Sequence, residues 1–249
     1  MTAIVGLLCK DGIVIGSDSS ATFTAGEHFR TIEQLTKKIT IIEDRVIIAC
    51  TGQIGLAQRF SDCVGKLWSN SAFRSKPQQE IVREFCKAGV MDFGSTQAGK
   101  GQIGALIAFP SGDKHHLCEF QLQDFQPELK SPGMWFVSMG SGQAITDPFL
   151  GLLRRVFWAT EQPTVSEGKF AVTWTLRHVI ELNPGGINGP PQIAVLEHAA
   201  DGKLKAKILD DAEISEHMEN AQEAEKHLGK YRDLLHSSGS EAIPPSPVS

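Results

Sequence analysis

Residues 3–18, AIVGLLCKDGIVIGSD, contain two short apolar runs separated by a Lys-Asp-Gly turn at 10–12. Asp-Gly between apolar runs is the strongest short-range signal of a β-hairpin. Residues 38–51, KITIIEDRVIIACT, repeat this arrangement around a Glu-Asp turn. We therefore expect the chain to open with four strands that pair as antiparallel hairpins.

The elements after this opening come in blocks. Hydrophobic periodicity and turn residues predict helices at 54–69 and 78–92, strands at 103–109, 115–122 and 134–139, helices at 145–159 and 166–182, and a final hairpin of QIAVLEH and KLKAKIL. The order ββββ, αα, βββ, αα, ββ differs from the strict alternation of a parallel α/β chain. We expect an α+β fold, a four-layer αββα sandwich of two antiparallel sheets flanked by helix pairs. No GxGxxG motif opens a helix after the first strand, which excludes a dinucleotide-binding fold.

The composition excludes two classes of partner. Of 249 residues, 24 are Lys or Arg and 29 are Asp or Glu, so the net charge is −5. A nucleic-acid binder requires a basic surface, and we expect no nucleic-acid partner. No stretch approaches the roughly 18 apolar residues of a membrane-spanning helix, and we expect no membrane partner. The 24 glycines indicate many tight turns.

Cysteine usage bears on the cellular compartment. The five cysteines are an odd number, widely spaced and without a CxxC motif: Cys9, Cys50, Cys63, Cys86 and Cys118. The start, MTAIVGLLCKDG, has neither the basic residues nor the long apolar run of a targeting segment. We expect reduced thiols in a cytoplasmic protein.

The composition changes clearly near the C-terminus. We expect the main domain over residues 1–210, followed by an amphipathic helix over 211–235 and a disordered Ser/Pro-rich tail over 236–249. The apolar side of this helix would pack against the outer surface of the main domain; it consists of Ile214, Met218, Ala221 and Leu228.

Thr2 is the first candidate for chemistry. Methionine is normally removed before a small residue, which would leave Thr2 with a free α-amine beside its hydroxyl. Such an amine titrates near 7.7–8.0, whereas a lysine titrates near 10.4, so the amine can accept the hydroxyl proton at about neutral pH. Many proteins also begin with Met-Thr and perform no chemistry.

Two charged residues are expected near Thr2. Asp18 ends the second strand of the first hairpin, and a hairpin returns its second strand beside the start of its first. Lys38 begins the next strand. If Lys38 pairs with Asp18, its charge lowers the cost of forming an alkoxide at Thr2. Alternatively, each is a solvated charge at a strand end.

Two glycine-rich turns complete the candidate set. Gly52, in ACTGQIG, closes a strand before a helix, where backbone N–H groups can bind an oxyanion. Ser141, in MGSGQAI, lies in a similar turn. Their alternatives are an ordinary β-to-α turn and a helix N-cap.

Metal chemistry has weaker support. His116 and Cys118 share one face of a predicted strand, but two ligands without a second cluster do not make a metal site. We expect no metal and no cofactor.

The strings TAIVGLLCKDGIVIGSDSSAT (2–22), KKITII (37–42), IIACTGQIG (47–55) and VSMGSGQA (137–144) together resemble proteasome β-type subunits. They are also similar to the peptidase component of the bacterial two-component heat-shock protease. The resemblance covers roughly residues 2–210. It implies the αββα fold of the N-terminal-nucleophile (Ntn) hydrolases, in agreement with the order of elements.

The resemblance also implies roles for the candidate residues. Thr2 would be the nucleophile and, through its amine, the general base. Asp18 and Lys38 would be the supporting ion pair. The Gly52 N–H would stabilise the oxyanion, and Ser141 would contact the terminal amine.

Substrate contacts are implied as well. Thr22 and Gly52 would hold an extended peptide through main-chain hydrogen bonds. Cys50 and Ile54 would line the pocket for the residue before the cleaved bond. Both are apolar, which favours a small or apolar side chain there.

Three departures from the family pattern stand out. The loop 21–36, ATFTAGEHFRTIEQLT, is longer than usual, and Ser20 replaces an arginine. Pro184 stands where the family has a serine, so it offers neither a hydroxyl nor an N–H to the amine network. Glu181 is the carboxylate expected to support the amine instead.

Taken together, these features predict a cytoplasmic threonine peptidase of a self-compartmentalising, proteasome-like ring. Its partners would be a polypeptide substrate, identical subunits in stacked rings and, optionally, an ATPase unfoldase. Two alternatives remain open: an Ntn amidohydrolase that acts on small amides, and a catalytically silent ring or scaffold subunit.

Overall fold

The first five-stranded sheet contains the N-terminal hairpin. The computed structural model describes residues 1–23, 32–98, 102–183 and 186–236. The strand order of this sheet is β10 (Phe136–Met139), β1 (Ile4–Leu8), β2 (Gly12–Ser17), β11 (Gln192–His198) and β12 (Leu204–Ile208). All its neighbours pair antiparallel. The register Ile4↔Ser17 brings the end of β2 back beside the start of β1, as the Asp-Gly turn predicts.

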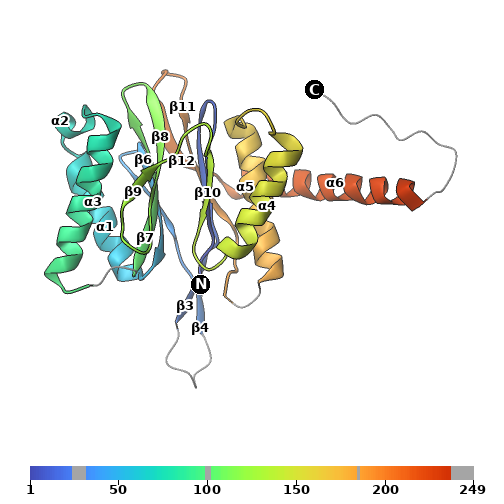
Figure 1. Cartoon of the computed structure of the whole chain (residues 1–249), viewed down its shortest axis with the longest axis horizontal. Helices are drawn as coiled ribbons and strands as arrows, with labels where there is room; N and C mark the ends of the chain where they lie inside the picture. The colour runs from blue at the N-terminus through green and yellow to red at the C-terminus, as the bar shows by residue number, and fades with distance from the viewer. Residues whose placement is uncertain (24–31, 99–101, 184–185, 237–249) are drawn as a thin grey trace.

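The second five-stranded sheet is also antiparallel. Its order is β5 (Ile39–Ile42), β6 (Val46–Gly52), β7 (Ile103–Ser111), β8 (Lys114–Phe120) and β9 (Pro127–Leu129). A separate two-stranded ribbon of β3 (Ser20–Phe23) and β4 (Ile32–Leu35) projects from the end of the sheets at which the N-terminus lies (Figure 1).

Helix pairs cover both outer faces of the two sheets (Figure 1). On the side of the second sheet lie α1 (Ile54–Trp68), the short α2 (Ser71–Arg74) and α3 (Gln78–Ser95). On the side of the first sheet lie α4 (Gln143–Phe157) and α5 (Val165–Leu182). The four-layer αββα architecture predicted from the sequence is therefore confirmed.

Alternation along β6 shows how one strand serves two cores. Ile47 and Ala49 point into the core between the sheets, whereas Val46 and Ile48 pack with α1 and α3. Successive side chains of a strand point to opposite faces of the sheet. A continuous apolar run is therefore what a strand between two buried layers requires.

Four short elements were not predicted from the sequence: the ribbon strands β3 and β4, the helix α2 and the strand β9. Each has only three or four residues. Hydrophobic periodicity needs a longer window to distinguish a strand or helix from a turn.

The C-terminal helix α6 (Asp211–His236) lies beside α5, and its far end extends away from the four layers (Figure 1). Ile214 and Ala221 are buried against the core, whereas Leu228 is 61% exposed. The helix is thus docked through its N-terminal part. The disordered tail was predicted over 236–249; His236 is the last residue of α6, and residues 237–249 lie outside the described residues.

None of the helices in the described part of the chain is long and apolar enough to cross a membrane. All five cysteines are free thiols.

Candidate active site

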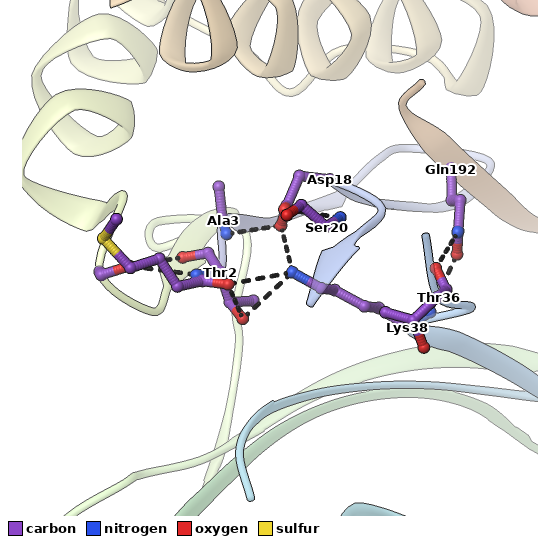
Figure 2. A network of polar contacts seen from close by, with 9 residues as sticks. Thr2, Ala3, Asp18, Ser20, Thr36, Lys38 and Gln192 are labelled. Atoms are coloured by element: carbon purple, nitrogen blue, oxygen red, sulfur yellow. Dashed lines mark hydrogen bonds and ion pairs between the residues drawn. The ribbon is translucent and has the colours of Figure 1, made fainter. Parts of the chain in front are cut away.

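Thr2 lies just before β1 and is held by the turn between β10 and α4 (Figure 2). Its backbone N–H donates to Ser141 Oγ at 3.0 Å, and its carbonyl accepts from the Gly142 N–H at 3.1 Å. Gly140 has a φ of +91°, and a Cβ there would lie 2.3 Å from the Thr2 carbonyl oxygen. The glycine-rich turn can therefore approach Thr2 closely because it carries no side chain at residue 140.

Asp18 and Lys38 form a buried ion pair with 2.7 Å between Lys38 Nζ and Asp18 Oδ1. Their side chains are 0% and 8% exposed. The backbone N–H groups of Ala3 and Ser20 also donate to the Asp18 carboxylate, at 2.9 and 3.2 Å. Burial lowers the pKa of Lys38, an effect that the Asp18 carboxylate opposes.

The Lys38 ammonium also reaches the nucleophile candidate. It donates to Thr2 Oγ1 at 3.2 Å and to the Met1 carbonyl at 3.2 Å, and Thr2 Oγ1 donates to the same carbonyl at 2.8 Å. With Met1 attached, the Thr2 nitrogen is an amide. Removing Met1 would leave a free amine at the position that now contacts Ser141. In the chain as described, burial and the Lys38 charge lower the pKa of the Met1 amine.

A cavity of about 570 Å³ opens beside Thr2 and Lys38. Gly52, Cys50 and Ile54 all contribute to its wall. Gly52 has a φ of +101°, and a Cβ there would lie 2.1 Å from the Gln102 carbonyl oxygen. A side chain at residue 52 would therefore clash with the next strand.

Apart from Lys37 and Lys38, the side chains of the cavity wall are uncharged. Ile48, Ile54 and Ala57 supply apolar surface, and Gln58 and Ser61 supply neutral polar groups. The partly buried Cys50 adds a thiol whose pKa is raised by burial to about 12, so it is a neutral thiol at physiological pH.

Ser20 and Ala21 lead from Asp18 into the cavity wall. The following residue, Thr22, lies in β3, where it is paired with Glu33 of β4. The middle of the enlarged loop, residues 24–31, lies outside the described residues.

Glu181 is placed differently from the other candidates. It lies near the end of α5, and its carboxylate accepts from Arg177 Nε at 2.8 Å. The same arginine contacts Glu225 of α6 at 3.2 Å. Glu181 thus belongs to an ion-pair network on the helical layer, whereas the Thr2 nitrogen contacts Ser141. Pro184 lies outside the described residues.

Two sets of supporting residues were missed by the sequence reasoning. Buried Thr146 donates to Ser138 at 2.7 Å, and Ser138 donates to the half-buried Asp147, so this network braces the turn carrying Ser141. The side chain of Gln192, at the start of β11, contacts the backbone on both sides of Lys37. Gln192 and Lys38 are 154 residues apart, so no local pattern could connect them.

Metal-binding side chains do not gather in this part of the molecule. Across the described ranges, no three His, Cys, Asp or Glu residues lie together as a metal ion would require. The His116 ring packs at a tilt against Phe109, and Cys118 is buried in the core. Burial lowers the pKa of His116 to about 4, which keeps it neutral.

Comparisons with known proteins agree with the fold. A family model described as "Proteasome subunit" matches residues 2–152. None of the curated proteins matches the sequence. Among solved structures, the chain is similar to an Anbu (Gly-1) mutant from Hyphomicrobium sp. strain MC1, with a TM-score of 0.71, 14% identity and coverage of 98% of this chain and 100% of that one. It is also similar to Anbu, described as an ancestral beta-subunit, from Yersinia bercovieri, with a TM-score of 0.71, 10% identity and the same coverage.

Proposed function

The chain belongs to the proteasome subunit family, whose model matches more than half of its length, and on this premise we propose that it is a threonine-type peptidase with Thr2 as its nucleophile. One observation carries the proposal. The Lys38 ammonium lies within hydrogen-bonding distance of both Thr2 Oγ1 and the buried Asp18 carboxylate, at 3.2 and 2.7 Å. An ion pair with a purely structural role would not require a hydroxyl group within hydrogen-bonding distance of its lysine.

The proposed reaction begins after removal of Met1. The free Thr2 amine, with a pKa of about 8 or lower beside a positive charge, takes the hydroxyl proton as Oγ1 attacks a peptide carbonyl carbon. The Lys38 charge stabilises the developing alkoxide. The tetrahedral intermediate then collapses, the amine returns the proton to the leaving nitrogen, and the C–N bond breaks. Water hydrolyses the resulting ester between Thr2 and the acyl fragment.

The proposed substrate is a polypeptide that occupies the cavity beside Thr2. The Gly52 N–H is the proposed oxyanion donor, and Thr22 and Gly52 offer main-chain groups to an extended peptide. Cys50 and Ile54 are the proposed walls for the residue before the cleaved bond. Their neutral character favours a small or apolar side chain there.

We further propose that identical subunits assemble into stacked rings in the cytoplasm and that an ATPase unfoldase can supply substrate. Family membership supports the assembly. Analytical ultracentrifugation or electron microscopy of the purified protein tests it, and a stable monomer at micromolar concentration would rule out the ring.

The decisive experiment combines intact mass with covalent labelling. We expect the purified protein to lack Met1 and a threonine-directed inhibitor to add its mass to Thr2, with no addition in Thr2→Ala. Fluorogenic peptides and small amides are assayed in parallel. Turnover of small amides alone would favour the amidohydrolase alternative. If Met1 is retained and neither labelling nor turnover is observed, the results would favour a catalytically silent ring subunit.

A further inference from the structure

The side chain of Gln192 holds the backbone that carries the active-site lysine (Figure 2). Its Oε1 accepts from the Lys38 N–H at 3.0 Å, and its Nε2 donates to the Thr36 carbonyl at 2.7 Å. Both polar atoms of one amide are thus used on the two sides of a single residue, Lys37. This matched pair of bonds fixes the position and the direction of the chain as it enters β5.

Gln192 also lies beside the strand that leads to Asp18. It is paired with Ser17 in the β2–β11 ladder, whereas β5, which follows Lys38, belongs to the other five-stranded sheet. One residue therefore links the strand that ends at Asp18 to the segment that begins with Lys38. This link spans the boundary between the two sheets.

The segment before Lys38 has little other anchoring. Leu35 is 73% exposed, and Lys37 is also exposed. The first buried apolar side chain after β4 is Ile39, at 3% exposure. Besides the two bonds from Gln192, the Thr36 N–H donates to the Ser19 carbonyl at 2.8 Å. Hydrogen bonds, and not apolar burial, locate these residues.

We propose that Gln192 is a positioning residue that sets the distance between the Lys38 ammonium and Thr2 Oγ1. The inference rests on the proposed peptidase activity, in which that distance governs how well the alkoxide is stabilised. A lysine side chain is long and flexible, so the place of its ammonium depends on where its backbone is held. Misplacing a catalytic group by about 1 Å can cost roughly 100-fold in rate.

The test compares Gln192→Met with Gln162→Met. Methionine has nearly the shape of glutamine, but it cannot make either hydrogen bond of the side-chain amide. Gln162 is the matched control because it is also partly buried and its Nε2 donates to a backbone carbonyl, that of Leu8, at 2.7 Å. Leu8 ends β1, and Thr2 lies before the start of that strand, so the control bond is remote from the site.

For Gln192→Met we expect kcat to fall about 10- to 100-fold with a smaller change in KM, because the proposed substrate contacts at Gly52, Cys50 and Ile54 lie on a different part of the cavity wall from the segment that Gln192 holds. We also expect the acid limb of kcat/KM to move to higher pH. When the Lys38 charge moves away from the Thr2 amine, it no longer lowers the pKa of that amine. Gln162→Met should keep both the wild-type kcat and the wild-type pH profile.

Wild-type kcat and pH profile in a folded Gln192→Met protein would overturn the positioning role, as would an equal loss in Gln162→Met. If Gln192→Met does not fold, the shortened Gln192→Asn, which cannot reach both backbone groups, is measured by the same criteria. A crystal structure of the variant gives a readout that does not depend on activity. If that structure shows Lys38 Nζ still within hydrogen-bonding distance of Thr2 Oγ1 and Asp18, the inference is also overturned. An inactive wild type, in contrast, would contradict the proposed function itself.

Discussion

At the scale of single residues, the buried pair of Asp18 and Lys38 dominates the site. Desolvating two charges costs free energy that their attraction offsets only when further hydrogen bonds satisfy both groups. Asp18 has those bonds from Ala3 and Ser20, and Lys38 has them to Thr2 and Met1. The pair is therefore an arrangement for placing charge beside Thr2, more than a source of stability.

We predict that Lys38→Met lowers the free energy of unfolding by about 3 kcal/mol, because it leaves the Asp18 carboxylate buried without its cation. Chemical denaturation measures this change. The control is Lys66→Met, which breaks the exposed Asp62–Lys66 pair, whose side chains are 61% and 75% exposed, and should cause no measurable change. Equal stabilities of Lys38→Met and wild type would mean that Asp18 is protonated or solvated.

At the scale of elements, the site depends on how strands end. Thr2 precedes β1, Asp18 follows β2, and Ser141 follows β10, and these three strands are neighbours in one sheet. Lys38 and Gly52 lie at the ends of β5 and β6, which are neighbours in the other sheet. In an antiparallel sheet, each strand begins at the end of the sheet where its neighbour finishes. The strand ends of the two sheets therefore bring together residues that are far apart in sequence.

The turn after β10 provides a test at this scale. We predict that Gly140→Ala loses most of the proposed peptidase activity, because φ is +91° and the new Cβ would lie 2.3 Å from the Thr2 carbonyl oxygen. Gly112→Ala is the matched control, with a φ of +61° and no heavy atom within 4 Å of the added Cβ. Both changes carry a backbone strain of about 1 kcal/mol, measured as a fall in Tm. Full activity in Gly140→Ala would show that the turn does not position Thr2.

At the scale of the whole molecule, the same burial that forms the core also controls its response to pH. Burial raises the pKa values of the Cys9, Cys50 and Cys118 thiols. Above a pH of about 8.5, the unfolded chain therefore loses thiol protons that the folded protein retains. Lys38 acts in the opposite direction, because its lowered pKa makes the unfolded chain bind more protons.

The pKa values of all five thiols are raised, which outweighs the lowered values of Lys38 and the Met1 amine. We therefore predict that the free energy of unfolding falls as pH rises from about 8.5 to 10, by roughly 1.4 kcal/mol per pH unit for each proton of difference. Denaturant titrations under reducing conditions at several pH values measure the slope. Cys50→Ala should make the slope shallower by the contribution of one thiol, because the pKa of Cys50 is about 12 in the folded protein. A slope that does not differ between this variant and wild type would contradict the linkage.

The sequence by itself determined the order of the longer strands and helices, the pairing of the hairpins and the identity of Thr2, Asp18, Lys38, Gly52 and Ser141 as candidates, but it did not predict β3, β4, α2 or β9. The elements follow from local patterns, namely apolar runs and Asp-Gly turns, which depend on neighbouring residues alone. The candidate residues follow from the Met-Thr start, the charged strand ends and the glycine-rich turns, and their roles come from the family resemblance. The tertiary structure alone decided that Arg177 of α5 pairs with Glu225 of α6 and that Gln192 holds the Lys38 backbone. Both outcomes depend on which strands and helices become neighbours, and contacts between residues this far apart in sequence leave no periodic signal in the chain.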